Sequence, residues 1–173
     1  MLKCLKHTIY LISLVISFNI SAEEWKNNAI EIGIVSGAGK IKEEFNGIEA
    51  NVFSRAFLGY RYNFNDNWGI ETQFNEYILS FSKPSQSQYN MKIGGEFKYS
   101  ATERLKLIIN GGLSKNFDNK GSSPHYDDSI GAYIGTGLRL EFHSGFNLAF
   151  TVGYEDFKFY RAVAYGFGLG FRF

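Results

Sequence analysis

The last eleven residues of the chain, VAYGFGLGFRF (Val163–Phe173), decide the fold. Large apolar residues take every second position of this segment, and small or charged residues lie between them. Successive side chains of a β-strand point to opposite faces, so the pattern predicts a strand with one apolar face and one face of alanine, glycine and arginine. The apolar face consists of Val163, Tyr165, Phe167, Leu169, Phe171 and Phe173.

The same alternation continues upstream and predicts an all-β chain of eight antiparallel strands, because no segment shows a competing helical period. The expected strands lie at about 30–35, 55–62, 68–75, 89–100, 105–114, 130–142, 146–155 and 163–173. Three connections, at 63–67, 101–104 and 143–145, are short. They alternate with connections at 37–51, 81–88, 118–128 and 156–161. The connections at 37–51, 81–88 and 118–128 are longer and polar. Short turns at one end and longer loops at the other are typical of an outer-membrane β-barrel.

The two faces of the expected strands indicate which side meets lipid. One face is continuously apolar and aromatic, and the other is rich in Gly, Ala, Asn, Thr and charged residues. An eight-stranded barrel has an interior that side chains just fill, which suits the second face better than rows of Phe and Leu. The alternative is a soluble, lipocalin-like barrel, whose apolar face would point inward.

The first 22 residues read as a secretory signal peptide. A basic start with Lys3 and Lys6 precedes an apolar stretch of 11 residues, Thr8–Phe18, and a small residue, Ala22, precedes Glu23. The apolar stretch is too short to span a membrane as a helix. We therefore expect a leader at 1–22 and one barrel domain at 23–173, with the chain's single cysteine in the leader.

The composition excludes several classes of protein. A hydrophobic content of 45% is too high for a disordered chain, and a net charge of +1 gives no footprint for nucleic acid. One cysteine makes neither a disulfide framework nor a structural zinc site.

Three segments carry a resemblance to a known family. Gly59–Glu71 resembles a strand–turn–strand hairpin of the OmpA/OmpX-like small outer-membrane barrels, and Gly135–Phe142 is similar to their later strands. The segment Tyr165–Phe173 is similar to their C-terminal assembly strand, which ends in Phe. The resemblance implies a monomeric barrel integral to the outer membrane, with loops at the cell surface and a role in membrane integrity, adhesion or resistance to host defence. The partners it implies are outer-membrane lipid and lipopolysaccharide, the barrel-assembly machinery, and host surface or serum proteins.

Charged residues on the inward face predict an ion-pair cluster in the half of the lumen nearest the short turns. Buried charges are costly unless they are paired, so we interpret the set as a structural plug. The alternative is a gate whose pairs exchange partners and admit small ions. The expected members are Glu31, Arg61, Glu71, Glu96, Lys98, Lys106, Arg139, Glu141 and Arg172.

The rival class is a lipid A-modifying enzyme, which would need a nucleophile held close to a base. His125 lies in a polar stretch with Ser122, Ser123, Asp127 and Asp128, and His143 adjoins Ser144 in a short turn. Neither setting predicts a rigid catalytic frame, so we expect no catalytic, cofactor or metal residues.

Aromatic residues near both ends of the strands predict two girdles at the membrane interfaces. The girdle near the longer loops is expected to hold Tyr89, Phe117, Tyr154 and Phe157. Glu76 and Lys115 interrupt the lipid-facing apolar pattern near that same rim.

Overall fold

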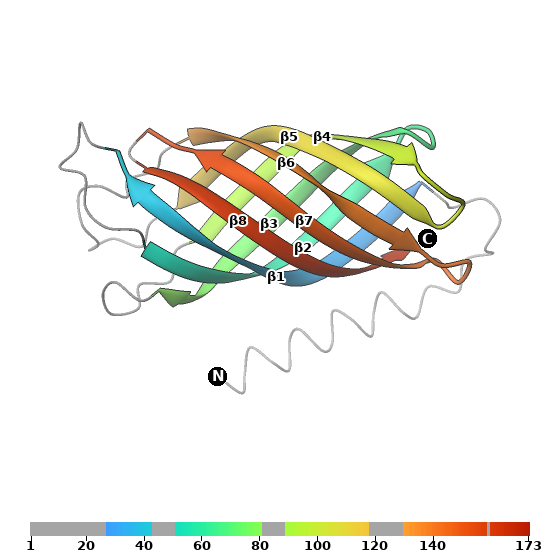
Figure 1. Cartoon of the computed structure of the whole chain (residues 1–173), viewed down its shortest axis with the longest axis horizontal. Coiled ribbons are helices and arrows are strands. Elements are labelled where there is room, and N and C mark those ends of the chain that lie inside the picture. The colour runs from blue at the N-terminus through green and yellow to red at the C-terminus, as the bar shows by residue number, and fades with distance from the viewer. Residues whose placement is uncertain (1–26, 43–50, 81–88, 118–129, 159) are drawn as a thin grey trace.

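A computed structural model of the chain describes residues 27–42, 51–80, 89–117, 130–158 and 160–173. These residues form eight antiparallel strands that close into a barrel, each strand pairing with its neighbours in the sequence and β1 pairing with β8 (Figure 1). The strands are β1 (Asn28–Ile41), β2 (Asn51–Asn63), β3 (Trp68–Ser80), β4 (Tyr89–Ser100), β5 (Leu105–Phe117), β6 (Ile130–Glu141), β7 (Phe146–Asp156) and β8 (Tyr160–Arg172). The predicted closed eight-stranded barrel is confirmed.

The two ends of the barrel differ. We call the end with the connections 64–67, 101–104 and 142–145 the short-turn end, and the opposite end the long-connection end. The beginning of β1 and the end of β8 both lie at the short-turn end, on the right of Figure 1. There Asn28 and Phe173 exchange two backbone hydrogen bonds of 3.2 and 2.9 Å, which complete the ring.

The apolar face of the strands points outward. Ile34 and Phe167 are 54% and 53% exposed, while Arg55 and Glu96, on the other face, are fully buried. A soluble barrel would show the opposite arrangement, so the lipocalin-like alternative is wrong. Among the described residues no helix is long and apolar enough to cross a membrane.

One wall of the lumen is apolar because glycines on β1 make room for aromatic rings from β2. A Cβ on Gly33 would collide with the ring of Phe57, and a Cβ on Gly37 would lie 2.8 Å from the ring of Phe53. Phe53 joins a buried apolar cluster with Val35, Ala162 and Ala164 of β1 and β8, and Phe57 packs against it. This apolar patch lies between the buried charges that the same two strands also carry, Glu31 on β1 and Arg55 and Arg61 on β2.

Candidate functional site in the barrel lumen

Two carboxylates and two guanidinium groups form a buried quartet in the short-turn half of the lumen. Arg139 on β6 donates through its two terminal nitrogens to the two carboxylate oxygens of Glu96 on β4, at 2.7 and 2.8 Å. Arg61 on β2 lies 3.3 Å from Glu31 on β1 and 3.5 Å from Glu96. Arg139 also lies 3.6 Å from Glu31, so both arginines contact both carboxylates. The quartet joins four strands and balances its own charge.

The remaining cations of the predicted cluster lie outside this quartet. Lys98 donates to the side-chain oxygen of Asn63 at 2.7 Å, and Lys106 donates to Ser100 at 2.8 Å. Arg172 lies 3.4 Å from Glu141 in a partly exposed pair near the short turns. The predicted set thus separates into one buried quartet and several local contacts along the inner wall.

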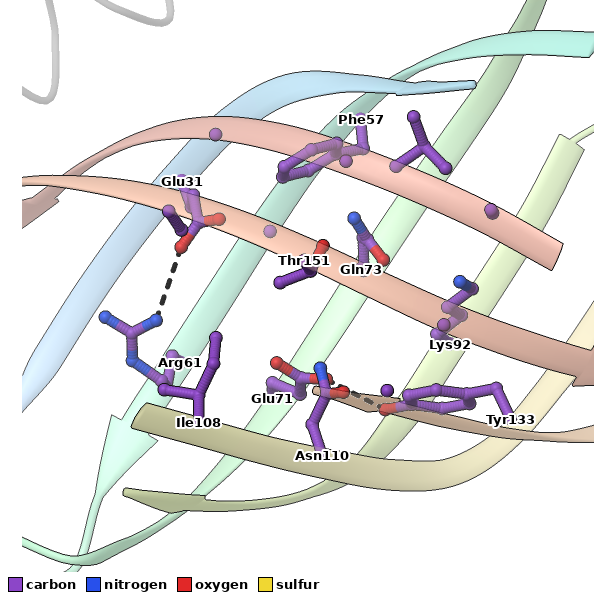
Figure 2. Close-up of a pocket in the computed structure, with 18 of the residues that line it drawn as sticks. Glu31, Phe57, Arg61, Glu71, Gln73, Lys92, Ile108, Asn110, Tyr133 and Thr151 are labelled. Atoms are coloured by element: carbon purple, nitrogen blue, oxygen red, sulfur yellow. Dashed lines mark hydrogen bonds and ion pairs between the residues drawn. The ribbon is translucent and has the colours of Figure 1, made fainter. Parts of the chain in front are cut away.

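Glu71 is the one carboxylate of the predicted set that makes no ion pair with a described residue. Its Oε1 accepts hydrogen bonds from the amide of Asn110 at 2.7 Å and from the hydroxyl of Tyr133 at 3.0 Å (Figure 2). The carboxylate lines a cavity of about 90 Å³ that Gln73 and Lys92 also line. A space of this size admits a few water molecules or a small hydrated ion.

A second buried charge group, which was not predicted from the sequence, lies on the other side of this cavity. Arg55 on β2 donates to Glu155 on β7 at 2.7 and 3.2 Å, and Lys92 on β4 lies 2.6 Å from the same carboxylate. This triad carries one net positive charge, and two of its members, Lys92 and Glu155, line the same cavity as Glu71. The alternation predicts an inward position for all three residues, but their contact depends on the register of the closed barrel.

Above the triad, neutral hydrogen bonds line the wall of the lumen formed by β3, β4 and β5. Asn90 on β4 accepts from Asn75 at 3.2 Å and donates to Ser114 and Asn116 on β5, at 2.7 Å each. All four residues are buried. The lumen therefore contains, from the short-turn end upward, a charge quartet, a cavity, a charge triad and an amide network.

The predicted assembly strand lies on the outer face of β8. Tyr165, Phe167, Leu169 and Phe171 are between 41% and 57% exposed. Phe173 follows the strand and is held by the hydrogen bonds to Asn28.

The predicted aromatic girdle needs one correction. Phe157 is only 1% exposed and its ring packs against Gly131, so it lies inside the lumen and not at the membrane interface. The cause is that the alternation of inward and outward side chains continues past the end of β7. Phe157 lies two residues after the inward-facing Glu155 and therefore also points inward. Tyr154, which has the opposite parity, is 38% exposed on the outer face.

The candidates for catalysis or metal binding gain no support from the described geometry. His143 and Ser144 lie in the exposed connection between β6 and β7. Within the described ranges no three His, Cys, Asp or Glu side chains gather to hold a metal ion. Ser122, Ser123, His125, Asp127 and Asp128 lie outside the described residues.

Comparisons with known proteins agree on the fold. No curated protein matches the sequence. Among solved structures, neisserial surface protein A matches with a TM-score of 0.66 at 15% identity, covering 84% of this chain and 97% of that one. Ail, the attachment invasion locus protein of Yersinia pestis, matches with a TM-score of 0.59 at 19% identity, covering 86% and 99%. OprG from Pseudomonas aeruginosa matches with a TM-score of 0.58 at 12% identity, covering 86% and 97%.

A family model gives the assignment that these distant likenesses do not. The model of the outer membrane protein beta-barrel domain matches residues 9–173, which is nearly the whole chain. The match agrees with the closed barrel, its lipid-facing apolar wall and its charged interior. The chain therefore belongs to the outer membrane protein β-barrel domain family and is an integral outer-membrane protein.

Proposed function

We propose that the protein is a non-enzymatic surface barrel that presents its longer connections for adhesion or for resistance to host defence. The observation that carries the proposal is the occupied lumen: the quartet, the triad and the amide network take up much of the interior, and an eight-stranded barrel has no room for a wide channel beside them. The long-connection end is then the part free to vary and bind, since rigid scaffolds commonly carry their binding residues on loops. We place that end at the cell surface and the short turns in the periplasm.

The distant neighbours support this role without establishing it. The structure of Ail, an attachment invasion protein, has been described in complex with the heparin analogue sucrose octasulfate. Neisserial surface protein A is named as a surface protein. By likeness of fold, we propose host surface or serum components as partners, together with outer-membrane lipid, lipopolysaccharide and the barrel-assembly machinery.

Loop replacement tests the proposal. Residues 43–50 and 118–129 are replaced, separately and together, by Gly-Ser segments of equal length, and cells are assayed for host-cell binding and serum survival. Loss of either activity supports the proposal, and unchanged behaviour of the double variant contradicts it. Each variant must still migrate as a compact band on SDS gels before boiling. This control shows that the barrel is folded, so that loss of binding can be attributed to the replaced residues.

The cavity favours one second function, a narrow pore for small ions. It lies between two charge groups that both contain arginine–carboxylate pairs, and Glu71 offers it a carboxylate with no cation in contact among the described residues. Partner exchange in the quartet would connect the cavity to the short-turn end. Recordings of the protein in planar bilayers test this: discrete conductances that Arg139→Gln enlarges support a gated pore, and a silent bilayer with both proteins excludes it.

Catalysis on lipid A is the remaining alternative, and mass spectrometry decides it. The masses of lipid A from cells with and without the protein should be identical if the barrel is non-enzymatic. A mass difference of one acyl chain or one phosphate would contradict our proposal.

A further inference from the structure

Two opposite charges stand on the lipid-facing wall on either side of β4. Glu76 lies four residues inside the end of β3 and Lys115 two residues inside the end of β5. Both have the outward parity of their apolar neighbours Phe74 and Leu113, which are 46% and 58% exposed. A charge on the lipid face of a barrel costs free energy that grows with its depth in the membrane.

Neither charge is neutralised within the described part of the chain. The carboxylate of Glu76 has no ion pair or hydrogen bond to a described residue, and its cross-strand neighbours are Ala56 and Tyr89. The ammonium of Lys115 lies 5.0 Å from the centre of the Phe117 ring, which is its described contact. Each side chain therefore has room for a partner from outside the chain.

The two charges lie at nearly the same height. Glu76 is eight residues above Trp68, where β3 starts, and Lys115 is ten residues above Leu105, where β5 starts. At roughly 2.5 Å of height per residue in a tilted strand, the difference is about 5 Å. Extended Glu and Lys side chains span that difference.

This arrangement is complementary to itself. Two copies in one membrane share their up–down orientation, so a symmetric pair is related by a twofold axis along the membrane normal. If the axis passes in front of β4, a residue on β3 of one copy faces β5 of the other at equal height. Glu76 then meets the partner's Lys115, and Lys115 meets the partner's Glu76.

The lipid-facing wall below the two charges, toward the short-turn end, has a hollow that allows close contact. Gly95 on β4 and Gly111 on β5 are cross-strand partners that both point outward. A Cβ on Gly95 would meet no atom closer than 4.0 Å, so the backbone is bare at this point. Ile93 and Ile109 stand beside the hollow and are 54% and 53% exposed, and on the proposed axis Ile93 would face the same residue of the second copy.

We propose that the β3–β5 face is a self-association surface, on which a second copy of this chain docks through two reciprocal Glu76–Lys115 ion pairs above the Gly95–Gly111 hollow. A zwitterionic lipid headgroup also carries both signs of charge. However, the charges are separated by two strand spacings, about 10 Å, which is more than one headgroup bridges. The inference departs from the monomer expected from the sequence.

Charge reversal tests the reciprocity. The purified full-length protein is reconstituted in vesicles of one neutral lipid, and self-association is measured by energy transfer between labelled copies. Glu76→Lys and Lys115→Glu should each lower the association constant roughly tenfold, because two outer-rim ion pairs become repulsions. The double variant E76K/K115E should restore it, since it rebuilds both pairs with the signs exchanged. Single variants without effect, or a double variant no better than the singles, would overturn the proposal.

A cysteine placed near the axis tests the location. Residues 23–173 contain no cysteine, so Ile93→Cys in protein produced without residues 1–22 gives one thiol per barrel, near the same thiol of the partner. Mild oxidation should yield a disulfide-linked dimer in the bilayer. The matched control is Leu169→Cys, lipid-facing on β8 and 49% exposed, which should stay monomeric. Equal linkage at both positions would mean random collision and would refute a specific surface.

Discussion

Arg139 and Glu96 form a two-point contact, with both terminal guanidinium nitrogens within 2.8 Å of a carboxylate oxygen and both residues almost completely buried. The pair joins β6 to β4 over the inner surface of β5. Removing one partner of a buried pair leaves the other charge uncompensated, and this costs far more than the pair itself contributes.

The first prediction concerns this pair. Arg139→Gln should lower the free energy of unfolding by about 3–5 kcal/mol, because Glu96 then keeps only the longer contact with Arg61. The measurement is urea unfolding in lipid vesicles followed by tryptophan fluorescence. The double variant E96Q/R139Q should lose less than the two single losses added together. Arg104→Gln, at an exposed site in a short turn, is the control. If Arg139→Gln lowered the free energy of unfolding no more than Arg104→Gln does, the buried ion pair would not have the predicted role.

The second prediction is an asymmetry within the triad. Glu155 contacts both Arg55 and Lys92, so Glu155→Gln leaves two buried cations without their carboxylate. Lys92→Met leaves the pair between Arg55 and Glu155 intact. The Glu155 variant should therefore unfold at a clearly lower urea concentration than the Lys92 variant. The reverse order would indicate that Lys92 serves Glu71 across the cavity more than it serves Glu155.

The third prediction contrasts two adjacent glycines. Gly94 faces the lumen, where a Cβ would collide with the Tyr133 hydroxyl and the backbone of Gly111, while Gly95 faces open space. Gly94→Ala should destabilise the barrel by about 1–3 kcal/mol through overpacking. Gly95→Ala should be neutral, or stabilising by up to about 1 kcal/mol, because it restricts the unfolded chain. The free energy of unfolding of both variants is measured in dilute detergent, where self-association does not contribute. Equal effects would contradict the assignment of Gly94 to the lumen side and Gly95 to the lipid side of β4.

The fourth prediction separates the two contributions of the last residue. Phe173→Ala keeps the backbone hydrogen bonds to Asn28 but removes the aromatic ring, whereas deletion of Phe173 removes both. If the ring is part of an assembly signal, both variants should accumulate unassembled in cells, while only the deletion should also be less stable after refolding in vitro. Heat-dependent migration on SDS gels measures the assembled fraction. Phe146→Ala, which removes a ring that contacts Phe171 from β7, is the control and should assemble normally.

Much of this architecture follows from the alternation of side chains between the two faces of each strand, here called parity. The alternation Val163–Phe173 determines which side chains face lipid, and strand number and closure follow once an apolar wall must meet lipid without open edges. Parity also predicted that Glu31, Arg61, Glu96 and Arg139 share the lumen. It does not say which of them touch, because contact depends on register and height. This is why Lys98 and Lys106 bind neutral oxygens and not the quartet.

The features that the sequence did not predict, the charge triad, the isolation of Glu71 and the inward position of Phe157, also depend on details of the three-dimensional structure. Arg55, Lys92 and Glu155 come from strands far apart in the sequence, and only the closed register brings them to one height. The isolation of Glu71 from cations depends on side-chain lengths across the cavity, which no linear pattern encodes. Phe157 was misplaced because the parity rule was stopped at the expected strand end.

The pairing of β1 with β8, the seam that closes the ring, determines when the barrel can become complete. Ala29 pairs with Arg172, so almost the whole domain separates the two strands that close the ring. The other seven seams join consecutive strands and can form as local hairpins, whereas this one must gather the ends of a long chain and bear the entropic cost of doing so. The last strand to leave the ribosome is also the strand that the first one needs. Ring closure therefore requires all eight strands to be available, and until it occurs both edge strands expose unpaired backbone groups.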